Sequence, residues 1–399
     1  MTGMFTYVER ENSAKIKVIG VGGAGGNAIN NMIAGNLNGV KFISANTDSQ
    51  ALEVSHAEIR IQLGTQITEG LGAGANPQVG RDAALENAEM IKDALADSHM
   101  VFITAGFGGG TGTGAAPVIA RLCKEMGILT VAVVSRPFSF EGRKRAKQAD
   151  EGILELKKAA DTVIIIPNDR LRGLASKNAK MVDMFKKADE ILLHSVKGIT
   201  DLIMMPGLVN LDFADVKTTM SRAGMAIMGI GISSGENRAL EAAERAISHP
   251  LLEDINISGA KGVLMNITSN SNLTMEEMTE ASERIYNEVG EDAEIIWGAV
   301  IDDSVGDEMS VTVIATGIGE KDKHKEAAPK AADPTYGGKV RDITPADLAR
   351  SPELDEPTFI RRRQAVNDRP ASELYREYKG IVIDNDDLDV PTFLRRKAD

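Results

Sequence analysis

Residues 108–114 read Gly-Gly-Gly-Thr-Gly-Thr-Gly, directly after an apolar run at 100–105 and directly before an apolar helical pattern at 115–126. Glycine lets the backbone approach a phosphate closely, and the start of a helix offers unpaired N–H groups at the positive end of its dipole. A strand, a glycine-rich turn and a helix in this order therefore predict an anion-binding loop.

A second glycine loop lies near the start of the chain. Residues 20–25 match G-x-G-x-x-G, between a β-branched run at 15–20 and a helical pattern at 27–33. Taken alone, this loop is typical of a dinucleotide fingerprint or of a tight turn with no ligand. Two such loops at the carboxyl edge of one parallel sheet suit a polyphosphate shared between amide nests. Neither loop contains G-K-[ST], which disfavours the ordinary P-loop classes and leaves most of the holding to backbone amides.

The first half of the chain alternates apolar strands with helices. Further strands are expected at 40–45, 59–63, 100–105, 128–134 and 162–166, and helices at 81–95, 115–126 and 142–158. Strands that are apolar throughout and separated by helices indicate a parallel sheet covered on both faces. The first domain is therefore predicted to be α/β.

A long helix at 180–204 leads to a second, smaller α/β domain. The expected strands of this domain are 225–232, 262–267, 293–301 and 310–315, and its expected helices are 237–247 and 274–289. After residue 319 apolar periodicity stops, which predicts a disordered tail. The predicted organisation is a flexible N-terminus at 1–12, a nucleotide-binding domain at 13–178, the central helix at 179–205, a second domain at 206–319, a linker at 320–383 and a terminal peptide at 384–399.

Composition excludes several classes of protein. The net charge of -13 argues against nucleic-acid binding. The single cysteine, Cys123, rules out a disulfide framework and is expected to be a buried apolar residue in a protein of a reducing compartment. The start of the chain has no secretory pattern, and the uncharged stretch at 100–120 is interrupted by glycines, so we expect a cytoplasmic protein without membrane insertion. The five histidines are scattered, which gives no metal cage.

Six motifs together identify a family. They are ANTD at 45–48, GLGAGANP at 70–77, GGGTGTG at 108–114, RPFSFEGRKR at 136–145, PND at 167–169 and NLDFAD at 210–215. In this order they resemble the tubulin-like cell-division GTPases of the FtsZ family across nearly all of residues 13–319. The resemblance implies a tubulin-like fold with a Rossmann-like parallel sheet, GTP and GDP as ligands, and Mg²⁺ held mainly by phosphates and water.

The resemblance also implies which residues hold the nucleotide. The phosphate and γ-phosphate contacts would come from Gly22, Gly23, Ala24, Gly25, Gly26, Asn27, Asn46, Ala73, Gly74, Gly109, Gly110, Thr111 and Gly112. The ribose and base contacts would come from Glu141, Arg145, Asn168, Phe185 and Asp189. Asp189 would accept hydrogen bonds from guanine N1 and N2 and would repel the acceptor of adenine.

Four of these five ribose and base residues have an ordinary alternative. Phe185 lies on the apolar face of the long helix and could be a core residue. Glu141 and Arg145 could be a solvated i,i+4 ion pair, and Asp189 could be surface charge.

The catalytic residues implied by the resemblance are Asp212 and Asp215, with Asn210 beside them. In the family this loop enters the pocket of the next subunit and orients the water that attacks the γ-phosphate, so the site is completed in trans. The alternative is a helix cap, with Asp212 at the N-cap and Asp215 one turn in.

The tail carries a repeated peptide, LDEPTFIRRR at 354–363 and LDVPTFLRRK at 388–397. Members of the family usually carry one such peptide, which docks onto membrane-anchoring and regulatory division proteins. The implied partner-binding residues are Asp389, Pro391, Phe393, Leu394, Arg395 and Arg396. The Arg run could also favour anionic lipid. The alternative for this segment is a degenerate linker with a basic patch.

The implied function is a GTPase that polymerises head to tail and forms the cytokinetic ring at midcell. Two alternatives remain at this point. A nicotinamide-dependent Rossmann oxidoreductase would use Asp48 near the ribose, and a tubulin-like scaffold would bind nucleotide without hydrolysing it. The second glycine loop disfavours the first alternative, and the presence of both Asp212 and Asp215 disfavours the second.

Overall fold

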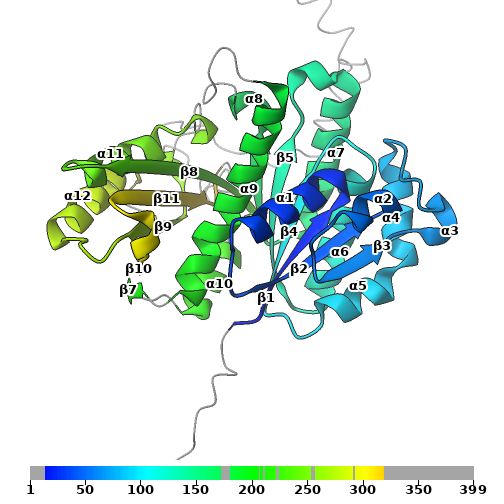
Figure 1. Ribbon diagram of the computed structural model, residues 1–399, viewed down its shortest axis with the longest axis horizontal. Helices are drawn as coiled ribbons and strands as arrows, with labels where there is room; N and C mark the ends of the chain where they lie inside the picture. Colours follow the sequence, from blue (N-terminus) through cyan, green and yellow to red (C-terminus); the bar gives the residue numbers. More distant parts are fainter. Residues whose placement is uncertain are drawn as a thin grey trace, which may run out of the picture. The chain divides into compact units, whose positions relative to one another are not determined.

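A twisted sheet of parallel strands runs through the first half of the computed structural model, which describes residues 14–171, 180–205, 207–209, 212–221, 224–252, 257–290 and 293–318 (Figure 1). Its strands are β1 (Ile16–Val21), β2 (Val40–Asn46), β3 (Ile59–Gln62), β4 (Met100–Gly106), β5 (Leu129–Arg136) and β6 (Thr162–Pro167). They are hydrogen-bonded in the order β3-β2-β1-β4-β5-β6, all parallel. The predicted α/β class is confirmed.

Helices cover both faces of this sheet. They are α1 (Gly22–Ala34), α2 (Ser49–Glu53), α3 (Thr65–Thr68), α4 (Pro77–Glu86), α5 (Ala88–Leu95), α6 (Thr111–Glu125), α7 (Arg143–Ala159), α8 (Asn168–Leu171), α9 (Met181–Met204) and α10 (Phe213–Ser221). One apolar core joins the sheet to α4, α5, α6 and α7, and a second core joins its other face to α1, α9 and α10. The central strands β1, β4 and β5 are therefore buried on both sides, which is why their sequences are largely apolar, whereas the edge strand β3 is only partly buried.

Two boundaries differ from the sequence expectation. Helix α1 begins at Gly22 rather than at residue 27, because the glycines form its first turn. The single helix expected at 81–95 is two helices, and their junction is Asn87, whose side-chain Oδ1 accepts a hydrogen bond from the Gly64 N–H at 2.7 Å. Helices α2, α3 and α8 are too short for a periodic pattern to reveal them.

The sheet continues into the second half of the chain. Its strands there are β7 (Gly207–Val209), β8 (Gly224–Ser234), β9 (Gly262–Ser269), β10 (Glu294–Ile301) and β11 (Glu308–Thr316). Strand β8 pairs in parallel with β6, while β11 lies antiparallel between β8 and β9, and β10 and β7 follow. Among the described residues the result is one sheet of 11 strands.

Two further helices and three short 3-10 turns complete the described part of the second half. They are α11 (Arg238–Ile247), α12 (Met275–Tyr286), η4 (Pro250–Leu252), η5 (Ile257–Gly259) and η6 (Asp303–Val305). Another 3-10 turn, η2 (Ser139–Glu141), lies in the first half between β5 and α7. Helices α11 and α12 share a third core with one face of the sheet, and α9 packs against Leu264 and Ile314 on the other. No helix in the described ranges is long and apolar enough to cross a bilayer.

The single thiol is enclosed, as the sequence predicts. Cys123 lies on α6 in the core under the sheet, fully buried. Burial raises the pKa of the Cys123 thiol to about 12. The thiolate form is therefore scarce at neutral pH.

Glycines let α11 approach β8 closely. A Cβ atom at Gly231 would lie 1.9 Å from the carbonyl oxygen of Ala242, and one at Gly229 would lie 2.0 Å from that of Ala246. Both contacts are to helix backbone, which cannot rotate away as a side chain could. The packing of α11 on β8 therefore requires glycine at positions 229 and 231.

We expect Gly231→Ala to destabilise the protein by about 1–3 kcal/mol, because the added methyl forces α11 away from the sheet. Gly259→Ala is the matched control, since Gly259 has open space around its Cβ position and no positive φ angle. The measurement is urea unfolding of the two variants and the parent. Equal midpoints for all three would show that β8 and α11 do not need this close approach.

Candidate functional site

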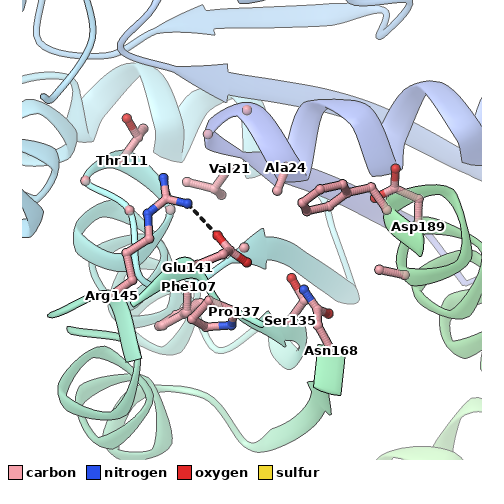
Figure 2. Close-up of a pocket in the computed structure, with 18 residues that line it drawn as sticks. Val21, Ala24, Phe107, Thr111, Ser135, Pro137, Glu141, Arg145, Asn168 and Asp189 are labelled. Atoms are coloured by element: carbon pink, nitrogen blue, oxygen red, sulfur yellow. Dashed lines mark hydrogen bonds and ion pairs between the residues drawn. The ribbon is translucent and has the colours of Figure 1, made fainter. Parts of the chain in front are cut away.

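A pocket of about 350 Å³ lies at the carboxyl ends of β1, β4 and β5 (Figure 2). It is lined by Val21, Gly22, Gly23, Ala24, Gly106, Phe107, Gly109, Gly110, Thr111, Gly112, Ser135, Pro137, Glu141, Arg145, Asn168, Phe185, Ala188 and Asp189. The two glycine loops of the sequence therefore face one common space.

The two loops touch each other at the floor of the pocket. Gly22 has a φ of +74°, and a Cβ atom on it would lie 3.0 Å from the Gly112 nitrogen. Only glycine permits both this backbone conformation and this approach. The N-cap residues of α1 and α6 are Val21, whose side chain is apolar, and Gly110, which has no side chain. Neither residue can accept a hydrogen bond from the first-turn N–H groups through a side chain. These N–H groups can therefore bind phosphate oxygens.

The opposite end of the pocket presents acceptors and a flat ring. Asn168 is 5% exposed, and its Oδ1 atom has no hydrogen-bond partner among the described residues. The half-buried carboxylate of Asp189 accepts a hydrogen bond from Asn31 Nδ2 at 3.1 Å. Phe185 is 42% exposed, so its ring is available to a ligand. A planar heterocycle with N–H donors fits this end, because it would satisfy both acceptors.

Glu141 and Arg145 stand at the rim as an ion pair between η2 and α7 (Figure 2). The Glu141 carboxylate also accepts the N–H of Phe138 at 2.9 Å, which fixes its position. The side chain of Glu141 is 14% exposed and that of Arg145 is 49% exposed. The i,i+4 ion pair of the alternative interpretation is thus present, but Glu141 is largely buried, and both residues line the pocket.

Six predicted nucleotide residues lie outside the lining. They are Gly25, Gly26, Asn27, Asn46, Ala73 and Gly74. Gly25 is buried against the Thr104 carbonyl, where a Cβ would approach to 2.5 Å, so it serves packing. Ala73 is buried next to Gly110, and the buried Asn46 accepts the Asp48 N–H at 3.3 Å. Asn27 and Gly74 are exposed, so these six residues do not form one buried layer.

Six lining residues were missed by sequence reasoning. They are Val21, Gly106, Phe107, Ser135, Pro137 and Ala188. All of them except Ala188 lie in the last two residues of β1, β4 or β5 or directly follow one of these strands. The rule that ligands bind beyond the carboxyl ends of parallel strands would have found these five.

The acidic residues Asp212 and Asp215 lie at the start of α10 and do not line the pocket. The Asp215 N–H donates to Asp212 Oδ1 at 2.9 Å, which is the capping contact of the alternative interpretation. Phe213 between them lies 6.0 Å, centroid to centroid, from the ring of His99, which directly precedes β4. The acidic pair is therefore at the amino edge of the parallel strands, opposite the pocket.

Some predicted residues cannot be placed in this geometry. Asn210 and the tail residues Asp389, Pro391, Phe393, Leu394, Arg395 and Arg396 lie outside the described residues. Asp48, the ribose acid of the oxidoreductase alternative, caps α2 through the Gln50 and Ala51 N–H groups and does not line the pocket.

Comparison with known proteins places this architecture. The model of the tubulin/FtsZ family GTPase domain matches residues 15–176, and the model of the FtsZ family C-terminal domain matches residues 224–319. The chain is 50% identical to the cell division protein FtsZ of Pseudomonas aeruginosa over 402 aligned residues, covering 99% of this chain and 100% of the relative.

The chain belongs to the FtsZ family.

Other FtsZ proteins agree with this assignment. FtsZ of Pseudomonas putida is 48% identical, covering 99% of this chain and 100% of the relative. A solved, empty FtsZ dimer from M. jannaschii is 46% identical with a TM-score of 0.74, covering 77% of this chain and 89% of that one. The tubulin-like fold expected from the motifs is confirmed, and the chain is an FtsZ-type cell-division GTPase.

We expect Asp189→Asn to alter the pH dependence of stability in the nucleotide-free protein. Burial raises the pKa of Asp189 from 3.8 to about 6, so between these values the folded state binds a proton that the unfolded chain has released. The contribution of Asp189 to the free energy of unfolding therefore falls as pH rises through this window. Asp189→Asn should raise the thermal midpoint at pH 7.5 and leave it nearly unchanged at pH 3.8.

Glu53→Gln is the control for this experiment, because Glu53 is an exposed carboxylate at the end of α2 and does not line the pocket. It should leave the difference between the two pH values as in the parent. A rise in midpoint for Asp189→Asn that is equal at both pH values would contradict a titrating carboxylate.

Proposed function

We propose that this FtsZ-family protein binds GTP in the pocket, hydrolyses it to GDP in a head-to-tail polymer, and forms the division ring at midcell. The observation that carries the proposal is the separation of two half-sites. The nucleotide pocket lies at the carboxyl edge of the parallel strands, and Asp212 and Asp215 lie at the amino edge.

The phosphate end of the pocket is suited to a triphosphate. Amide groups at the starts of α1 and α6 converge there, and Arg145 adds a cation at the rim. These groups stabilise negative charge without a P-loop lysine. Mg²⁺, when bound to the phosphates and water, would supply further charge neutralisation.

The base end favours guanine over adenine. Asp189 and the unpartnered Oδ1 of Asn168 are both acceptors, and guanine offers donors at N1 and N2. Adenine would place its N1 acceptor toward a carboxylate, which is repulsive. Phe185 would stack on the ring.

Hydrolysis requires a second subunit in this proposal. The acidic pair of one molecule cannot reach the pocket across its own sheet, but a head-to-tail contact brings the amino edge of one sheet over the carboxyl edge of the next. Asp212 and Asp215, with Asn210, would then orient the attacking water, since phosphoryl transfer needs mainly positioning and charge stabilisation. The solved FtsZ dimer from M. jannaschii supports self-association as a property of the family.

We expect Asp212→Asn to separate catalysis from capping. Asparagine keeps the Oδ1 acceptor for the Asp215 N–H but removes the charge. The free energy of unfolding should stay within about 0.5 kcal/mol of that of the parent, because Asn and Asp cap helices equally well. Phosphate release at saturating GTP should fall on the order of 100-fold.

A mixing experiment tests whether the site forms in trans. Asp212→Asn keeps its pocket, and Asp189→Ala keeps its acidic pair but lacks the guanine contact. Each alone should release little phosphate, and a 1:1 mixture should recover activity, because an intact pocket then meets an intact acidic pair. A mixture no more active than the sum of its components, or specific activity unchanged on dilution, contradicts the proposal.

The tail is proposed to tether the polymer. We infer from the sequence that 388–397 binds membrane-anchoring and regulatory division proteins, and that 354–363 binds the same site and raises the effective concentration. The two peptides share Leu, Asp, Pro, Thr, Phe and both Arg positions.

Deleting residues 388–397 should strongly reduce midcell fluorescence of a tagged protein, and deleting 354–363 should reduce it partly. Deleting 364–373 is the control, since it shortens the tail by the same ten residues without touching either peptide. Equal ring intensity for the 354–363 deletion and this control would show that the upstream peptide is spacer only.

A further inference from the structure

A buried hydroxyl lies directly behind the phosphate end of the pocket. Thr47 follows the last residue of β2 and is fully buried, and its Oγ1 lies 2.7 Å from Oγ1 of Thr111. Thr111 begins α6 and lines the pocket. Thr47 itself does not line the pocket.

Hydrogen-bond counting gives this contact a direction. Each hydroxyl has one proton, and the distance alone allows either threonine to donate. Among the described residues, Thr111 is the hydrogen-bond partner of the Thr47 side chain. If Thr111 donated to Thr47, the proton of Thr47 would be buried without an acceptor, at a cost of about 1–3 kcal/mol. Donation from Thr47 to Thr111 uses that proton and leaves the proton of Thr111 free for the pocket.

We propose that Thr47 is a positioning residue, whose hydroxyl donates to Thr111 Oγ1 and thereby turns the Thr111 proton toward a nucleotide phosphate. This inference rests on the proposed binding of GTP and GDP in the pocket. A phosphate oxygen is an acceptor only, so it needs the Thr111 hydroxyl as a donor. Fixing the donor direction before the ligand arrives removes a reorientation step from binding.

The backbone around Thr47 is held in place by contacts with residues 68 and 70. Its carbonyl oxygen accepts a hydrogen bond from Thr68 Oγ1 at 3.3 Å, and the N–H of Ser49, two residues on, donates to the Gly70 carbonyl at 3.0 Å. Gly22 also lies close to Thr111, since a Cβ atom on Gly22 would be 3.3 Å from the Thr111 Cβ, and glycine has no side chain to offer a competing acceptor. Thr47 is therefore the side chain that sets the direction of the Thr111 hydroxyl.

A double-mutant cycle tests the proposal with GDP and with GTP at 4 °C, measured by calorimetry on the full chain stripped of nucleotide. Thr47→Val keeps the volume and removes the proton, and Thr111→Val does the same at the partner position. We expect Thr47→Val to weaken binding about three- to tenfold, the effect of one hydrogen bond. In the Thr111→Val background the same change should have no further effect, because no hydroxyl remains to be oriented.

Conservative variants distinguish orientation from packing. Thr47→Ser keeps the donor and should bind nucleotide as the parent does, and Thr47→Val should again weaken binding in a Thr111→Ser background. Thr47→Ala replaces Thr47→Val if the valine variant does not fold, as judged by its thermal midpoint without nucleotide.

Three results would overturn the inference. Equal losses for Thr47→Val with and without the Thr111 hydroxyl would mean that Thr47 acts through packing. Parent-like affinity of Thr47→Val would mean that the direction of the hydroxyl does not matter. A parent protein that binds neither nucleotide would refute the proposed function itself, whereas the first two results leave GTP binding intact.

Discussion

The close approach of two helix starts is the constraint on which the rest of the site depends. Strands β1 and β4 are adjacent and parallel, so α1 and α6 begin side by side, and Gly22 and Gly112 meet with no side chain between them. A residue with a Cβ atom at Gly22 would be strained and would push the loops apart. Because the amides converge here, anionic charge can be stabilised without a lysine. The remaining pocket residues then only need to select what is attached to the phosphates.

In the proposed function, selection of the base falls to a partly buried region at the other end of the pocket. The acceptor atoms of Asp189 and Asn168 are themselves partly or fully shielded from bulk water, and this burial raises the pKa of Asp189. A group in that state interacts strongly with a matching donor and poorly with a mismatched acceptor, since the low local dielectric amplifies both effects. The helix that carries Phe185 and Asp189 also packs against strands of the second half, and its Gly198 carbonyl accepts a hydrogen bond from Asn266 Nδ2 at 3.4 Å. The base end and the second half thus share one rigid element.

Strands and glycine loops were predictable from sequence because their signals are local. An apolar run that ends at glycine, as at 15–20 or 100–105, leaves few alternatives to a buried parallel strand. Contacts between distant residues were not predictable. The break at Asn87 depends on Gly64, and Ala188 enters the pocket only because α9 packs against the sheet. Asp212 illustrates a different limit, since a carboxylate that caps a helix and one that positions water have the same local sequence, and only the position of a second subunit distinguishes them.

The burial of Cys123 has a practical consequence for labelling. A sole thiol sealed in the core and held protonated will not react with maleimides while the protein is folded. A cysteine introduced at an exposed site such as Leu71 would then be the single attachment point for a fluorophore, with no need to remove the native one. Conversely, slow modification of the native thiol would report opening of α6 from the sheet, so the wild-type chain carries its own probe of local unfolding at the carboxyl end of α6.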